Sequence, residues 1–134
     1  MSDTIIGVDL GGTRVRAARL DGSLNILYRE ETLTRDEDGL DATLSRIKDL
    51  IRNVLPKDHA PIAGIGVSAP GALNPMTGVV VKPPNLAGWH NVPLGDMLRD
   101  EFGVPVFVGN DANVAALAET ILGAGRGYRN VIFI

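Results

Sequence analysis

The sequence contains no cysteine, so disulfides and thiolate metal sites are excluded within its 134 residues. Aromatic residues make up only 4%, and a core must therefore be built mainly from Val, Ile, Leu and Ala. No apolar run approaches the roughly 20 residues of a membrane-spanning helix. Lys and Arg form no cluster and the net charge is −3, which argues against a nucleic-acid surface and against a basic membrane patch.

What is present fits one ordinary globular domain, with 45% apolar and 22% charged residues. The two histidines, His59 and His90, lie far apart in a sequence without neighbouring ligands, and we interpret them as loop residues rather than metal ligands. The N-terminus lacks the positive segment of a signal peptide. We therefore expect a cytoplasmic protein.

Short apolar runs at the start of the chain predict strands over residues 5–10, 14–20 and 24–32, joined as an antiparallel meander with Asp21-Gly22 as a turn. Apolar residues then recur at helical spacing from Leu40 to Leu55, and Pro56 ends that helix. Further along, we predict a strand over 62–67, an irregular segment over 68–93 with an apolar run at 79–81, a helix over 94–102 and a strand over 105–108.

The last part of the chain is predicted to form a helix from Asn110-Asp111 that ends near Gly123 and Gly125. We expect its apolar residues to face inward; they are Val114, Ala115, Leu117, Ala118, Ile121 and Leu122. Residues 130–134 are predicted to be a strand that needs neighbours to pair with. The predicted division is therefore an N-terminal lobe over residues 1–128 and, over 129–134, the first strand of a C-terminal lobe that this chain lacks.

The order of these elements predicts an α/β fold with one mixed five-stranded sheet and helices on both faces. This is the layout of the ribonuclease-H-like, actin-type ATPase domain. A fold of this kind does not by itself fix a function.

The first segment that could carry chemistry is Asp9-Leu10-Gly11-Gly12-Thr13. Two glycines let the backbone turn tightly and bring N–H groups close to an anion, and Thr13 adds a hydroxyl. Asp9, at the end of a strand, could hold a hydrated magnesium ion, and phosphoryl transfer needs such groups. A plain Gly-Gly hairpin with a capping Asp explains the same residues.

Two further segments follow strand ends. Ser68-Ala69-Pro70-Gly71 is suited to the approach of a ligand at a strand end, and equally to a simple Pro-Gly turn. In the segment from Pro83 to Trp89, Asn85 offers both a donor and an acceptor for a sugar hydroxyl, and Trp89 could form a wall of a pocket. A rigid Pro-rich loop anchored by a buried Trp is the alternative.

The fourth segment, Gly109-Asn110-Asp111-Ala112-Asn113, follows a strand and opens a helix. Asp111 could accept a proton from an attacking hydroxyl as a general base, and Asn110 could orient the sugar. Asn and Asp are also favoured as helix N-caps, and for Asn110 capping and sugar contact are compatible. The four segments occur at the ends of strands predicted to be adjacent, so their loops could converge on one edge of a cleft.

Taken together, these motifs resemble the ROK family (repressors, open reading frames, kinases), and most closely its bacterial glucokinase-type members. The resemblance runs from about Thr4 to Ile134. The motifs that carry it are Ile6-Gly7-Val8-Asp9-Leu10-Gly11-Gly12-Thr13, Gly66-Val67-Ser68-Ala69-Pro70-Gly71, Asn85-Leu86 with Trp89, and Gly109-Asn110-Asp111-Ala112-Asn113.

The resemblance implies ATP-dependent phosphorylation of a hexose, with glucose as the first candidate. Asp9, Gly11, Gly12 and Thr13 would then help to hold the magnesium ion and the nucleotide phosphates.

For the sugar, the resemblance implies a pocket lined by Gly71, Asn85 and Asn110. Asp111 would activate a sugar hydroxyl, typically the 6-hydroxyl, for attack on the γ-phosphate. A homo-oligomer is also expected, with residues 130–134 as one contact.

Family kinases also carry a Glu-x-Gly-His sugar motif, a zinc site of Cys and His, and a second phosphate motif, all beyond the first lobe. None occurs here, so zinc is expected only in the missing lobe, and we expect the isolated chain to have little or no kinase activity. The sequence leaves the sugar open, with N-acetylmannosamine, fructose and allose as lesser candidates. It also leaves the donor open between ATP and polyphosphate.

Three other functions fit the sequence less well. A sugar-responsive repressor of the same family would need a DNA-binding helix-turn-helix before the first strand, for which no room is expected because that strand begins near residue 4. A non-catalytic sugar-binding protein is disfavoured by the presence of both Asp9 and Asp111. Another actin-type ATPase, such as a chaperone lobe, is disfavoured by the Asn85 and Asn110 segments.

Overall fold

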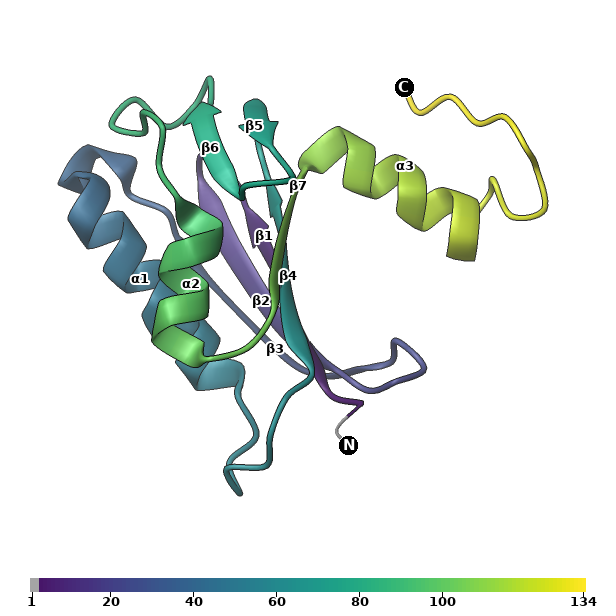
Figure 1. Ribbon diagram of the computed structural model, residues 1–134, viewed down its shortest axis with the longest axis horizontal. Coiled ribbons are helices and arrows are strands. Elements are labelled where there is room, and N and C mark those ends of the chain that lie inside the picture. The colour runs from purple at the N-terminus through teal and green to yellow at the C-terminus, as the bar shows by residue number, and fades with distance from the viewer. Residues whose placement is uncertain (1–2) are drawn as a thin grey trace.

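The computed structural model describes residues 3–134 and is built around a five-stranded sheet in the order β3-β2-β1-β4-β7 (Figure 1). Its strands are β1 (Ile5–Leu10), β2 (Arg14–Leu20), β3 (Ile26–Leu33), β4 (Gly64–Ala69) and β7 (Val106–Asn110). β2 pairs antiparallel with both β1 and β3, whereas β4 pairs parallel with both β1 and β7. The predicted meander and the predicted mixed sheet are both confirmed.

The remaining elements connect these strands. They are the single-turn helix η1 (Asp36–Asp38), the helices α1 (Leu40–Val54), α2 (Leu94–Phe102) and α3 (Asp111–Leu122), and a small hairpin of β5 (Ala72–Asn74) and β6 (Val79–Lys82). The hairpin lies within the segment predicted to be irregular. It is held to the following segment by a bridge between Val80 and Val92.

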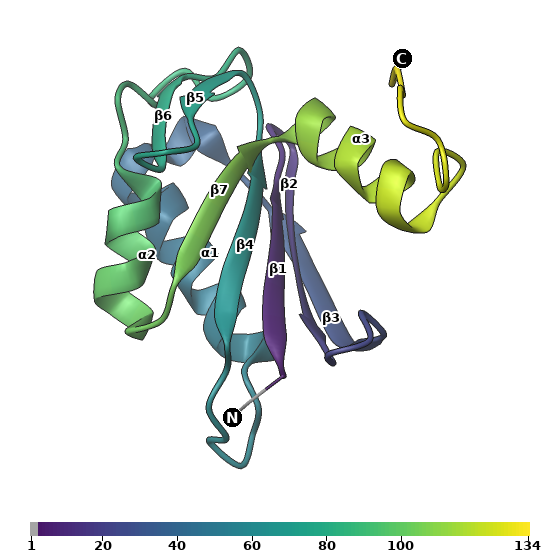
Figure 2. The same cartoon turned by 45° about the vertical axis from the view of Figure 1, so that its right-hand side comes forward.

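The core lies between the sheet and the pair of helices α1 and α2, which cover the same face (Figure 2). Alternate residues of β1, namely Ile6, Val8 and Leu10, are buried on that face. Ile47 and Ile51 of α1 are almost fully buried as well. Each such side chain stabilises the fold by about 1.5–3 kcal/mol relative to its exposed state.

The second face of the sheet is open, and α3 leaves β7 on that side of the sheet (Figure 2). The start of α3 contacts this face, since a Cβ placed on Gly109 would lie 2.7 Å from Val114 Cγ2. However, no residue of α3 is buried, so the prediction that its apolar residues face inward is wrong for residues 3–134. Of the residues of α3, only Val114 lines the hollow on this face.

Residues 130–134 form no strand, and the prediction of one is not met in the structure. A strand is held by hydrogen bonds to a neighbouring strand, and these residues have none beside them. Their apolar side chains are exposed, with Ile132 at 87%. None of the helices in residues 3–134 is long and apolar enough to cross a membrane.

The connection between β2 and β3 is longer than the predicted two-residue turn. The carboxylate of Asp21 accepts hydrogen bonds from the backbone N–H groups of Ser23 and Asn25, both at 2.9 Å. Leu24 takes up a positive φ of 65° within this turn. The side chain of Asp21 therefore organises residues 21–25 as a loop, and β3 starts at Ile26 rather than at Leu24.

Candidate functional site

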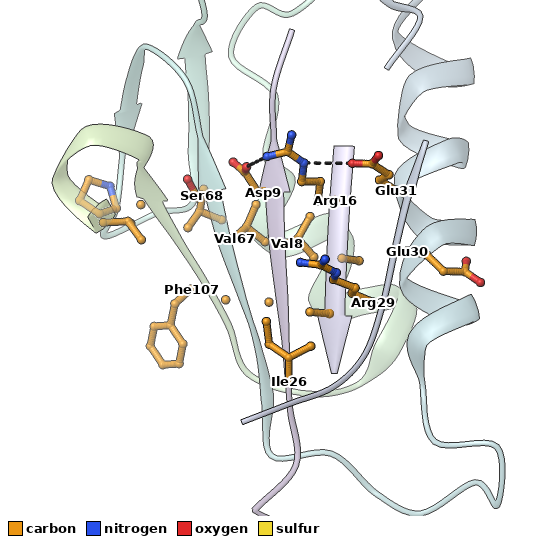
Figure 3. Close-up of a pocket in the computed structure, with 18 residues that line it drawn as sticks. Val8, Asp9, Arg16, Ile26, Arg29, Glu30, Glu31, Val67, Ser68 and Phe107 are labelled. Carbon is orange, nitrogen blue, oxygen red and sulfur yellow. Dashed lines mark hydrogen bonds and ion pairs between the residues drawn. The ribbon is translucent and has the colours of Figure 1, made fainter. Parts of the chain in front are cut away.

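A row of residues crosses the open face of the sheet. In β1, β4 and β7 the member of the row is the second-last residue of the strand. Asp9 pairs in register with Arg16 on one side and with Ser68 on the other. The row continues from Arg16 to Glu31 and from Ser68 to Gly109. All five residues line one hollow, and Figure 3 shows Asp9, Arg16 and Glu31 following one another along it. Ser68 lies inside β4 rather than after it, because β4 ends two residues later than predicted.

Arg16 lies between two carboxylates, with its Nε 3.1 Å from Glu31 Oε2 and its Nη1 3.9 Å from Asp9 Oδ2. The three side chains are 51–62% exposed. Ion pairs this exposed stabilise a protein by about 0–1 kcal/mol, and the contact to Asp9 is the longer of the two. The carboxylate of Asp9 is therefore only weakly engaged and is accessible to a cation.

The turn after β1, residues 11–13, is called here the glycine turn. It is closed by a hydrogen bond of 2.9 Å from the N–H of Gly11 to the carbonyl of Arg14. Within residues 3–134, the N–H groups of Gly12 and Thr13 and the hydroxyl of Thr13 donate to no other residue. Three donors beside an exposed carboxylate fit a phosphate group together with a magnesium ion.

The buried Thr34 holds the glycine turn through two hydrogen bonds. Its hydroxyl donates to the carbonyl of Gly11 at 2.7 Å, and its N–H donates to the carbonyl of Thr13 at 2.8 Å. Its own carbonyl accepts a hydrogen bond from Arg46 of α1. The turn is thus tied to the core-forming helix.

Residues 83–89, called here the asparagine loop, lie directly against the glycine turn. A Cβ placed on Gly12 would lie only 2.5 Å from the Cβ of Asn85. That spacing is too short for any residue with a side chain at position 12. The loop is anchored by Leu86 and Trp89, which are buried in the core. Of the two interpretations of Trp89, the structure confirms the loop anchored by a buried Trp.

A second contact connects Gly71 with the end of β7. Gly71 has a φ of 73° and packs closely against Pro84. Its carbonyl accepts a hydrogen bond of 2.9 Å from Nδ2 of Asn110. The Oδ1 of Asn110 accepts from the N–H groups of Ala112 and Asn113, which confirms the predicted N-cap. One N–H of this amide remains for a ligand.

Asp111 is the first residue of α3, and its side chain is exposed. Its Oδ1 accepts a hydrogen bond of 2.8 Å from the N–H of Ala112, which leaves Oδ2 without a hydrogen-bond partner among the described residues. A carboxylate at a helix N-terminus is favoured by the helix dipole. The strand β7 thus carries an accessible carboxylate to the same edge of the sheet that holds Asp9.

The predicted site residues therefore meet in two contacts, Gly12 with Asn85 and Gly71 with Asn110, on one edge of the sheet. Sequence reasoning did not identify Arg16 or Thr34, whose roles depend on hydrogen bonds and register between distant segments. The described residues contain no group of three or more His, Cys, Asp or Glu side chains placed to hold a metal ion. Asp9 would therefore need phosphate oxygens and water as its fellow ligands, as is usual for magnesium.

The model of the ROK family matches residues 5–134, nearly the whole chain. The chain belongs to the ROK family. It is 39% identical over 128 residues to a glucokinase from Thermotoga maritima, and this match covers 96% of the chain and 40% of that relative. The chain thus spans about two fifths of the length of this ROK relative.

Solved ROK structures share the fold. A ROK family glucokinase from Streptomyces griseus, in complex with glucose and AMPPNP, matches with a TM-score of 0.81 and 31% identity, covering 92% of this chain and 38% of that one. A ROK hexokinase from Thermus thermophilus matches with a TM-score of 0.80 and 34% identity, covering 92% and 40%. The predicted ribonuclease-H-like, actin-type ATPase fold is therefore confirmed.

Proposed function

We propose that the protein to which these residues belong transfers the γ-phosphoryl group of ATP to a hexose, with glucose as the first substrate to test. The observation that carries the proposal is the meeting of the glycine turn and the asparagine loop at Gly12 and Asn85. This contact brings a set of anion-binding donors next to an amide suited to a sugar. The similarity to glucokinases supports the same reaction.

In this proposal Asp111 is the general base. Its exposed carboxylate would accept the proton of the attacking sugar hydroxyl while that oxygen forms its bond to the γ-phosphorus. The bond from the γ-phosphorus to the oxygen of the β-phosphate would break in the same transfer, and ADP would leave. The hydrogen bond from the N–H of Ala112 to Oδ1 would hold the carboxylate in place and leave Oδ2 for the proton. Asp111 would return the proton to solvent after product release.

Asn85, Asn110 and Gly71 would orient the sugar. The remaining N–H of Asn110 would donate to a sugar oxygen, because its other amide positions already bond to Gly71 and to the start of α3. These bonds fix the rotamer of Asn110 before the sugar arrives. A side chain held in this way loses little conformational entropy on binding.

ATP would supply the phosphoryl group, and Mg²⁺ would neutralise charge on its phosphates. The residues fit both groups. The free N–H groups of Gly12 and Thr13 and the Thr13 hydroxyl would hold phosphate oxygens, Gly11 would shape the turn, and Asp9 would hold the hydrated ion. The proposal includes a cytoplasmic location, where ATP is available, and a homo-oligomeric state.

The test is release of ADP by the full-length protein, supplied with magnesium-ATP and a panel of hexoses that begins with glucose. Turnover with one hexose supports the proposal and identifies the substrate. A parallel series with polyphosphate distinguishes the phosphoryl donor. A folded protein that releases no ADP above the sugar-free control with any hexose contradicts ATP as the donor. If it also forms no sugar phosphate from polyphosphate, the transfer of phosphate to a hexose is contradicted as well.

A further inference from the structure

Between β3 and α1 the chain passes beside both functional loops. Thr34, the first residue after β3, holds the glycine turn through its hydroxyl and its N–H. Two residues later, Asp36 contacts the asparagine loop. Its Oδ2 accepts a hydrogen bond of 2.7 Å from the N–H of Ala87. Residues 34–36 therefore connect to both sides of the Gly12–Asn85 contact.

The hydrogen bond from the N–H of Ala87 to Asp36 links the exposed part of the asparagine loop to the segment before α1. Ala87 follows Leu86, whose buried side chain is one anchor, and precedes Gly88, where an added Cβ would lie 3.8 Å from the backbone N of Leu40 in α1. A carboxylate forms a stronger hydrogen bond to a backbone N–H than a neutral acceptor does. Asn85 lies two residues before Ala87 in the same loop.

Two features of this segment are energetically unfavourable, and both accompany the position of the Asp36 carboxylate. Oδ1 of Asp36 is buried and has no hydrogen-bond partner among residues 3–134, which is unfavourable for an acceptor. The preceding residue, Arg35, adopts a left-handed backbone conformation with a φ of 51°, which is unfavourable for a residue with a side chain. The chain takes this conformation as it turns from Thr34 to Asp36.

We propose that Asp36 is a positioning residue for the sugar: it holds the asparagine loop through the N–H of Ala87 and so keeps Asn85 against Gly12. Asp36 does not touch the sugar in this account. It sets where Asn85 presents its amide relative to the glycine turn. The kinetic part of the inference depends on the proposed hexokinase function, whereas the structural part does not.

The experiment compares three variants of the full-length protein with the wild type. Asp36→Ala removes the acceptor of the Ala87 N–H. Asp36→Asn keeps an acceptor oxygen at that position and is the conservative rescue. Glu37→Ala is the matched control, because Glu37 is the adjacent acidic residue, is exposed, and makes no side-chain hydrogen bond or ion pair within residues 3–134.

The first readout is hydrogen–deuterium exchange of the peptide that covers residues 84–89. Asp36→Ala should speed its exchange, while Glu37→Ala should leave it as in the wild type and Asp36→Asn should lie close to the wild type. This readout needs no activity. Unchanged exchange in Asp36→Ala, or equal changes in Asp36→Ala and Glu37→Ala, overturns the inference even if the enzyme phosphorylates glucose.

The second readout is steady-state kinetics with the hexose that the wild type turns over. Asp36→Ala should raise KM for the sugar by about tenfold, the scale of one lost charge-assisted hydrogen bond, and change KM for ATP by less than about twofold. Asp36→Asn should restore most of the sugar KM. Equal increases in both KM values would indicate general loosening and would overturn the positioning role. If the wild type itself shows no turnover, the proposed function fails, and the exchange readout alone decides on the role of Asp36.

Discussion

Gly12 and Asn85 lie so close that a Cβ at position 12 would be 2.5 Å from the Cβ of Asn85. They belong to segments more than seventy residues apart in the sequence. Their contact joins the turn that offers free N–H groups to the loop that offers an amide. A side chain at position 12 that pushes both segments apart should therefore affect both halves of the proposed site.

The contact leads to a prediction for Gly12→Ala in the full-length protein. The added methyl group overlaps Asn85, and the two loops must move apart to accommodate it. We expect kcat/KM for the sugar to fall by about tenfold or more, measured by ADP release. Gly66→Ala is the control, since a Cβ there meets nothing within 4 Å among the described residues. Equal activity of Gly12→Ala and the wild type would show that the contact is not needed.

Replacing Asn85 by Ala should weaken sugar binding and leave nucleotide binding nearly intact. The side chain would lose its hydrogen bonds to the sugar, each of which contributes about 0.5–1.5 kcal/mol. We expect KM for the sugar to rise by roughly threefold to tenfold, with KM for ATP within about twofold of the wild type. Initial rates with each substrate varied in turn give both values. Similar effects on the two constants would contradict the assignment of Asn85 to the sugar.

Thr34→Val tests the support of the glycine turn. The variant keeps the shape of the side chain but leaves the carbonyl of Gly11 without its hydroxyl donor. We expect a loss of about 1–3 kcal/mol in the free energy of unfolding and a higher KM for ATP.

Thr43→Val is the matched control for Thr34→Val. Thr43 is also buried, and its hydroxyl donates to the carbonyl of Gly39 at 2.9 Å, away from the glycine turn. Denaturant unfolding should show a loss of stability in both variants, but only Thr34→Val should raise KM for ATP. If KM for ATP rose in both Thr34→Val and Thr43→Val, the rise would follow from lost stability, and the specific support of the glycine turn by Thr34 would be contradicted.

Asp21 makes the stability of the β2–β3 loop depend on pH. The N–H and the side-chain amide of Asn25 lower the pKa of Asp21 below its ordinary value of 3.8 in the folded protein. A carboxyl group with a lowered pKa stabilises the fold above its unfolded pKa, and this contribution is lost as pH falls through the folded pKa.

Asp21→Asn should therefore lower Tm at neutral pH, and its difference from the wild type should shrink as the pH falls below about 3.8. Thermal unfolding followed by circular dichroism at several pH values measures this difference. Glu37→Gln, at an exposed acidic residue whose side chain makes no hydrogen bond within residues 3–134, should show no such difference. A Tm difference for Asp21→Asn that stays constant with pH would contradict the ionic role.

Much of the fold could be predicted because local patterns determine it. The apolar alternation of β1, the amphipathic repeat of α1 and the cap at Asn110 are all visible in the sequence, and the structure confirms them. The sequence of α3 correctly indicated a helix with apolar residues. It wrongly indicated that these residues are buried, because none of them is. Periodicity shows that a helix has an apolar side, but not whether the described residues supply a partner for it.

The site was predicted less completely than the fold. The sequence indicated which residues carry chemistry, since Asp, Asn and Gly at strand ends are informative by type. It could not indicate the partners, because the row from Glu31 to Gly109 depends on strand register and the bond from Ala87 to Asp36 spans 51 residues. Asp36 is one acidic residue among three in η1, and only its contact distinguishes it.

The central claim is that Asp111 is the base of a phosphoryl transfer. Asp111→Asn in the full-length protein tests it most directly, because the amide keeps an acceptor for the N–H of Ala112 but cannot take up the proton of the sugar hydroxyl. Asp111→Ala is measured beside it. We predict that kcat falls by about 10²–10⁴ in both variants while their circular dichroism and Tm stay close to the wild type. A loss of less than about tenfold in either folded variant would contradict the assignment.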